Sequence, residues 1–175
     1  YMDERRDPVK ATHAACKYLK DLYKKFDNWN LALAAYNCGE GRVLRASKLH
    51  QTYDFWQLHS LPRETRNYIP YFLSAAIIAK FPEKYGFKVE TAEPFTYEIV
   101  NLEKSADIAV LARVAGLKAS VLRDYNPELR QSATPTIENY PLKLPVGRKG
   151  PFLSAWNAIP EDERFAPQFI VHRVR

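Results

Sequence analysis

One short stretch, LALAAYNCGEGRV, places polar residues at the end of an apolar run, where they could bind a ligand. An alanine-rich apolar run ends abruptly at Tyr36 and Asn37, and a Cys-Gly-Glu-Gly turn follows. A helix end leaves backbone polar groups without intrahelical partners. Tyr36 and Asn37 therefore either mark a simple helix stop or stand at the wall of a cleft, where the polar groups of a ligand can use them.

Glu64 and Glu40 are the two carboxyl groups that could serve as proton donors near such a cleft. Glu64 lies close to Arg63 and Arg66, which favour its ionised form and make it a poor acid. Its simpler role is to order the start of a helix as a capping residue near Ser60, and that role is compatible with a place in a cleft wall. Glu40 lies between two glycines and is interpreted as a solvated loop charge.

The sequence gives little indication of a metal site or of a disulfide framework. The histidines show no ligand spacing, and no cysteine pairs with them, so we predict no metal site and no cofactor. They are His13, His50, His59 and His172. Cys16 and Cys38 are too few for a disulfide framework. They are either two small buried apolar side chains or one bridge formed in an oxidising compartment.

The composition is that of a globular protein, with 46% hydrophobic and 26% charged residues. No apolar run approaches the length of a membrane span. Residues 1–87 hold 14 Lys and Arg against 9 Asp and Glu, which could attract an anionic partner. A nucleic-acid binder would gather such residues along one helix or stripe, whereas here they are spread over several helices. We therefore rank nucleic-acid binding last and predict no nucleic-acid partner.

The elements that position these residues are helical up to residue 87. Asp7-Pro8 predicts an N-cap and a first helical position, so a helix covers 8–26 with Tyr18, Leu22 and Phe26 in its core stripe. Residues 29–36 are apolar almost all round, which predicts a buried helix.

The rest of this half continues the helical pattern. A short helix is expected over 42–49, after a left-handed Gly39. A longer helix runs from the 60–62 segment to Pro82, and Pro70 should kink or split it. Trp29 is assigned to the core, whereas Trp56 is equally compatible with the core and with an exposed ligand platform.

The composition changes after residue 87, where 88–94 reads as a polar linker. Residues 95–102 alternate in the manner of a strand, 106–115 and 120–125 are short helices, and 140–144 is a second strand. This β-α-α-β unit covers 95–148, a connector covers 149–168, and 169–175 looks like the first strand of a further unit. The fold class is therefore α+β.

These motifs carry a family resemblance. ALAAYNCGEGRV followed by LPRETRNYIPYF, with YMDERRDP before them and KYGF after them, resembles the C-terminal half of the lysozyme-like catalytic domain of lytic transglycosylases. The stretch ADIAVLARVAGLKASVLRDYNPEL with YPLKLPVG resembles a LysM domain, a module that binds N-acetylglucosamine polymers. The last strand, FIVHRV, resembles the opening of another LysM repeat, and Lys104-Ser105-Ala106-Asp107 replaces the usual Gly-Asp-Thr.

The resemblance implies a function and a set of site residues. Such enzymes cleave the β-1,4 bond between N-acetylmuramic acid and N-acetylglucosamine and leave a 1,6-anhydro end. Carried over by motif, Tyr36 and Asn37 line one wall of the substrate cleft, and Glu64 and Tyr68 lie on the opposite wall. The family's catalytic Glu, in a Glu-Ser motif, has no counterpart here and is expected upstream, so no catalytic residue is assigned.

The resemblance also implies a place and a partner. Peptidoglycan glycan strands are the expected partner, so the periplasm or cell envelope is the expected location, and any membrane association is expected through a segment before residue 1. A non-catalytic module that binds peptidoglycan or N-acetylglucosamine is the alternative function.

Overall fold

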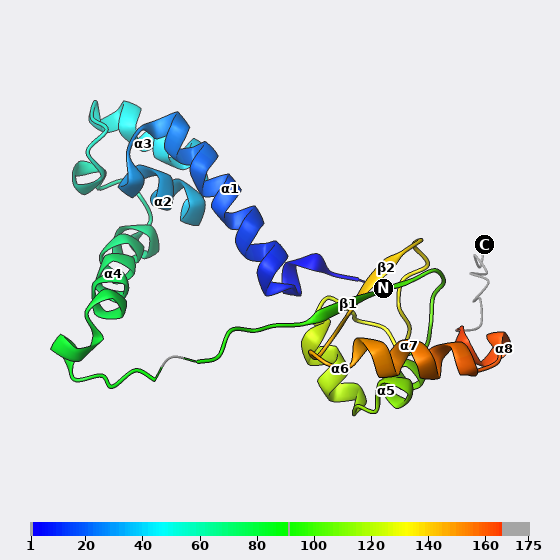
Figure 1. The fold of residues 1–175 in the computed structure, drawn as a ribbon. Coiled ribbons are helices and arrows are strands. Elements are labelled where there is room, and N and C mark those ends of the chain that lie inside the picture. The colour runs from blue at the N-terminus through cyan, green and yellow to red at the C-terminus, as the bar shows by residue number, and fades with distance from the viewer. Residues whose placement is uncertain (1, 91, 166–175) are drawn as a thin grey trace, which may run out of the picture. The chain divides into compact units, whose positions relative to one another are not determined.

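The computed structural model describes residues 2–90 and 92–165 (Figure 1). The chain forms two compact units, which are treated separately below. One unit comprises Thr12–Ala92, and the other combines the N-terminal segment up to Ala11 with the chain from Glu93 onward. Within the described residues, no helix is long and apolar enough to cross a membrane. The α+β class is confirmed, because helices dominate and a single small sheet accompanies them among these residues.

The helical unit is built on four α-helices with two short 3-10 turns. The elements are α1 (Pro8–Phe26), α2 (Trp29–Cys38), α3 (Glu40–His50), a 3-10 turn at Phe55–Gln57, α4 (Arg63–Lys80) and a 3-10 turn at Pro82–Tyr85. The expected cap of α1 is confirmed, because the Asp7 carboxylate accepts hydrogen bonds from the backbone N–H groups of Val9 and Lys10. Asn28 caps α2 in the same way, through Asn30 and Leu31.

The core of this unit centres on α2. Every residue from Leu31 to Ala35 is buried, as the all-round apolar pattern predicts. They pack with Leu22 and Phe26 of α1, with Val43 of α3 and with residues that precede or open α4. The helix ends where Gly39 takes a φ of 90°, a positive value that suits glycine, and α3 begins at the next residue.

Several expectations about this core are wrong. Trp29 is 54% exposed and stacks on Tyr23, with ring centroids 4.4 Å apart, because it opens α2 at the edge of the core. Tyr18 is also exposed, whereas Leu22 and Phe26 of the same stripe are buried. Cys16 is exposed and both cysteines are free thiols, so neither the bridge nor a buried Cys16 is present.

Helix α4 departs from its predicted form in two ways. Pro70 does not split it, since the helix runs without interruption from Arg63 to Lys80. Its apolar face, which a helix normally packs against a core, is buried only at Ile69, while Phe72 and Ile77 are exposed. Its main partner among the described residues is α2, which covers its N-terminal turns.

The other unit has the predicted β-α-α-β order. Strand β1 (Glu98–Leu102) pairs antiparallel with β2 (Tyr140–Leu144), with Glu98 opposite Leu144 and Leu102 opposite Tyr140. Between them come α5 (Ile108–Ala115) and α6 (Ala119–Tyr125), and after them α7 (Lys149–Ala158) and α8 (Glu161–Arg164). The inward side chains of both strands pack on α5, α6 and α7 in one core.

Two segments join this unit that the sequence pattern did not assign to it. Phe152 and Trp156 of α7 are buried in the core, with ring centroids 5.6 Å apart, so the unit extends beyond the boundary expected at residue 148. The N-terminal segment, with a 3-10 turn at Glu4–Arg6, also packs here: Met2 bridges Leu129, and the Asp3 N–H donates to the Glu128 carbonyl at 2.8 Å. The strand expected at 169–175 and His172 lie outside the described residues.

Candidate functional site

The two motifs predicted to line opposite walls of a cleft meet between the end of α2 and the start of α4. The Asn37 carbonyl oxygen Oδ1 accepts a hydrogen bond of 2.8 Å from the Thr65 hydroxyl, and Thr65 is buried. Asn37 is half-buried, and within the described residues its Nδ2–H donors have no protein partner. The arrangement fixes the amide by its oxygen and leaves two donors for a ligand.

The aromatic candidates differ in exposure. Tyr36 is 41% exposed, and its ring centroid lies 5.8 Å from that of Tyr18 on α1. Tyr68 is half-buried against the core of the helical unit, with its ring 6.3 Å from that of Phe72. Tyr18 is a ligand-facing candidate that the sequence did not predict, because a helical stripe of apolar residues does not show where the core ends.

The structure does not support a capping role for Glu64. The residue before α4 is Pro62, and no side chain caps the helix, so the pairing with the Ser60 region is wrong. Glu64 is exposed in the first turn of α4. Its neighbour Thr65 holds Asn37, and Tyr68 lies one helical turn further along.

Glu40 is not a free loop charge. It opens α3 and pairs with Lys25 across 3.1 Å, and both side chains are more than 40% exposed. Its exposed ion pair with Lys25 is that of a structural surface charge. Among the described residues no group of three or more His, Cys, Asp and Glu side chains could hold a metal ion.

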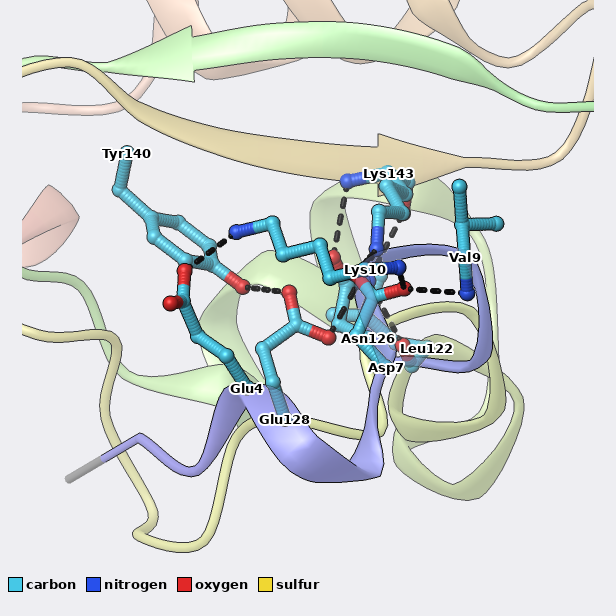
Figure 2. A network of polar contacts seen from close by, with 9 residues as sticks. All are labelled: Glu4, Asp7, Val9, Lys10, Leu122, Asn126, Glu128, Tyr140 and Lys143. Carbon is cyan, nitrogen blue, oxygen red and sulfur yellow. Dashed lines mark hydrogen bonds and ion pairs between the residues drawn. The ribbon is translucent and has the colours of Figure 1, made fainter. Parts of the chain in front are cut away.

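A buried polar network holds the N-terminal segment to the unit that carries the sheet (Figure 2). The ammonium of Lys143 on β2 is hydrogen-bonded to the Asp7 carboxylate and lies 3.7 Å from Glu128 Oε2. Asp7 and Glu128 are almost fully buried, and the Tyr140 hydroxyl donates to Glu128 Oε1 at 2.8 Å. The buried Asn126 amide ties the same strand to α6 through the backbone of Lys143 and Leu122.

The pKa shifts in and beside this network favour the protonation states that hold the fold together. Burial opposes ionisation of Asp7, but the hydrogen bonds from Lys143 and from the helix backbone outweigh it and lower the pKa of Asp7. Burial and the Glu128 charge raise the pKa of Tyr140, so its phenol stays protonated. The hydrogen bond to Glu4 raises the pKa of Lys10, and the hydrogen bond from Arg5 lowers the pKa of Asp3 to about 2. The carboxyl groups shifted here are thus held ionised.

The loop that follows β1 also uses its polar groups internally. The Ser105 hydroxyl donates to the Thr134 carbonyl, and the Ala106 N–H donates to the Thr134 hydroxyl at 2.9 Å. Asp107 caps α5 by accepting from the Ala109 N–H at 2.6 Å. These bonds fix the loop that stands in place of Gly-Asp-Thr and leave it few groups for a ligand.

Comparisons with known proteins follow the same division. Residues 1–59 match the model of the transglycosylase SLT domain, and residues 96–161 match that of the lytic transglycosylase MltD LysM-like domain. Membrane-bound lytic murein transglycosylase D of Escherichia coli K12 is 38% identical over 136 residues, which are 74% of this chain and 30% of that protein. The protein of the same name from strain CFT073 gives the same figures.

A third relative covers less of the chain. A putative tributyltin chloride resistance protein of Alteromonas sp. strain M-1 is 49% identical over 47 residues, which are 26% of this chain and 23% of that protein. The chain therefore spans under a third of the length of these curated relatives. The first family model ends before Glu64 and Tyr68, so the second half of the predicted wall lies outside both models.

Proposed function

We propose that this chain, which joins part of a transglycosylase SLT domain to the LysM-like domain of lytic transglycosylase MltD, belongs to a peptidoglycan lytic transglycosylase. Its parent protein would cleave the β-1,4 bond between N-acetylmuramic acid and N-acetylglucosamine and leave a 1,6-anhydro end. The substrate would place it in the bacterial cell envelope, on the periplasmic side.

The observation that carries the proposal is the hydrogen bond between Asn37 and Thr65. It joins the two motifs that the resemblance assigns to opposite walls of one substrate cleft, Tyr36-Asn37 on α2 and Glu64 with Tyr68 on α4. Amide donors suit the carbonyl of an N-acetyl group, and exposed aromatic rings suit the apolar face of a sugar. We assign these four residues to substrate binding.

The chemistry needs one protonated carboxyl to donate to the leaving oxygen while the C6 hydroxyl of the substrate closes on the anomeric carbon. Most glycosidases use two carboxyl groups instead. Glu40 is ion-paired, and Glu64 is exposed at a helix start, so neither has the environment of a general acid. We propose that the acid comes from outside these 175 residues and that the chain alone has no transglycosylase activity.

Mass spectrometry of the products released from purified sacculi tests this assignment. The chain alone should release no 1,6-anhydro muropeptides but should sediment with sacculi, and Asn37→Ala should reduce the sedimented fraction. Release of anhydro products would place the acid within the chain and make Glu64→Gln and Glu40→Gln the next variants. Retention without release would also suit the second candidate, a module that only binds glycan.

The two candidates can be separated by complementation. Joined to the upstream part of a relative's catalytic domain, the chain should restore anhydro-product release if it supplies a working wall, and it should remain inert if it only binds glycan. Nucleic-acid binding would show as salt-dependent retention on DNA with none on sacculi.

A further inference from the structure

A hollow of about 350 Å³ in the helical unit carries two arginines and no carboxylate. Helix α3 contributes Arg42, Arg45 and Leu49, and the segment before α4 contributes Ser60, Leu61 and Pro62. The Ser60 N–H donates to His50 Nε2 at 3.2 Å, which ties the segment before α4 to the end of α3. Two different elements therefore form the hollow, and a hydrogen bond holds them together.

The two guanidinium groups have no partner in the protein. Within residues 2–90 and 92–165, no hydrogen bond or ion pair involves the side chain of Arg42 or Arg45, although other surface cations such as Lys25 are paired. The two arginines stand three positions apart on α3, so they share one face of the helix and repel each other. An anion in the hollow would offset that repulsion and accept hydrogen bonds from both guanidinium groups.

The rest of the lining indicates what kind of anion fits. Leu61 is buried and Leu49 is 69% exposed, so an apolar floor and rim accompany the two charges. A planar guanidinium matches a carboxylate through two parallel hydrogen bonds. A short peptide with ionised carboxylates and small apolar side chains offers both features, whereas a phosphate polymer offers only the charge.

The hollow also adjoins the proposed substrate wall along the chain. Pro62, at its edge, is two residues before Glu64, and Arg42 follows Asn37 after the Gly39 turn. In peptidoglycan the muramic acid unit carries a peptide stem with free carboxylates. We infer that Arg42 and Arg45 form a binding site for the carboxylates of this stem peptide, an inference that rests on the proposed function.

Binding of the whole chain to three soluble probes tests this site. The probes are glycan strands with their stem peptides, the same strands stripped of peptide by an amidase, and the isolated stem tetrapeptide. Wild type should bind the peptide-bearing strands at least about tenfold more tightly than the stripped strands, as charge-assisted hydrogen bonds predict. The variant R42Q/R45Q should lose that preference and bind stripped strands as wild type does.

Two further variants make the result specific. K17Q/K20Q removes the same charge from exposed positions on α1 and should keep the preference. R42K/R45K keeps the positive charge but lacks the planar guanidinium, so it should lose most of the preference for peptide-bearing strands. Equal wild-type affinity for both strands, or a preference that survives R42Q/R45Q, would overturn the site.

The isolated tetrapeptide separates this inference from the proposed function. If wild type binds neither strand but binds the tetrapeptide through Arg42 and Arg45, the carboxylate site is supported and the proposed glycan-binding role is refuted. If neither strand nor tetrapeptide binds, both fail. Displacement of the tetrapeptide by inorganic phosphate or DNA at equal concentration would show a general anion site and overturn the assignment to carboxylates.

Discussion

Replacing Lys143 by Met should destabilise the unit that carries the sheet more than replacing its partner Asp7 by Asn, although both changes break the same ion pair. Lys143→Met leaves Asp7 and Glu128 buried without their cation, and removal of one partner from a buried pair costs about 3–5 kcal/mol. Asp7→Asn leaves the ammonium 3.7 Å from Glu128 and keeps an oxygen that can cap α1. Its cost is then that of one charged hydrogen bond, about 1.5–3 kcal/mol.

Hydrogen exchange at the amides of Val100 and Leu142 measures this difference within one unit. These residues are opposite each other in the two-stranded sheet, so their protection reports the opening of the sheet itself. The double variant should cost about 1–3 kcal/mol less than the two single changes added together, because both act on one interaction. Asp21→Asn, which removes an exposed pair with Lys24, should change protection by about 0.5 kcal/mol or less.

The pH dependence of the same measurement gives a second check with a definite sign. The pKa of Asp7 is lowered in the folded state, so its ionised form stabilises the fold above the ordinary Asp pKa near 3.9. The advantage of wild type over Asp7→Asn should be complete near neutral pH and fade as the pH falls through the lowered pKa of Asp7. If Lys143→Met costs no more than Asp7→Asn, or if the advantage grows on acidification, the description of the network is refuted.

Three further predictions concern other parts of the chain. Phe152→Ala should destabilise the unit that carries the sheet by about 3–5 kcal/mol, whereas the change of its exposed neighbour, Leu153→Ala, should cost under about 1 kcal/mol, as measured by thermal unfolding. Gly39→Ala should destabilise the helical unit by about 1–2 kcal/mol because of its φ of 90°, while Gly41→Ala, in α3, should raise its stability, because a Cβ there would make only an ordinary contact, 3.7 Å from Arg45 Nη1. Thr65→Val should cost about 1–2 kcal/mol in urea unfolding through loss of the hydrogen bond between α2 and α4, and no change would remove the join on which the substrate wall depends.

The sequence predicted the local structure well where one physical signal dominated. The Asp7 cap, the Pro8 start and the Gly39 stop follow from backbone chemistry, and the structure confirms all three. The buried run from Leu31 to Ala35 follows from its apolar pattern. Trp29 shows the limit of that pattern, because a residue at the first position of a buried helix can still lie at the edge of the core.

Contacts between residues far apart in the chain could not be predicted from the sequence. Asp7 was predicted only as a helix cap, and Lys143 only as a polar position in a strand, since no local pattern links them. The same holds for Asn37, whose partner Thr65 follows it by 28 residues. The residues proposed to bind substrate were chosen by motif resemblance, and only the packing of α2 on α4 shows how they are arranged.

The place of Asp7 in the unit that carries the sheet has a consequence for the order of events during synthesis. Asp7 and Lys143 are separated by 136 positions, and the chain between them includes the whole of Thr12–Ala92. At about 5–20 residues per second, a ribosome makes Asp7 roughly 7–27 seconds before Lys143. The helices between Thr12 and Ala92 are therefore synthesised before residues 2–11 can pair with Lys143 of β2.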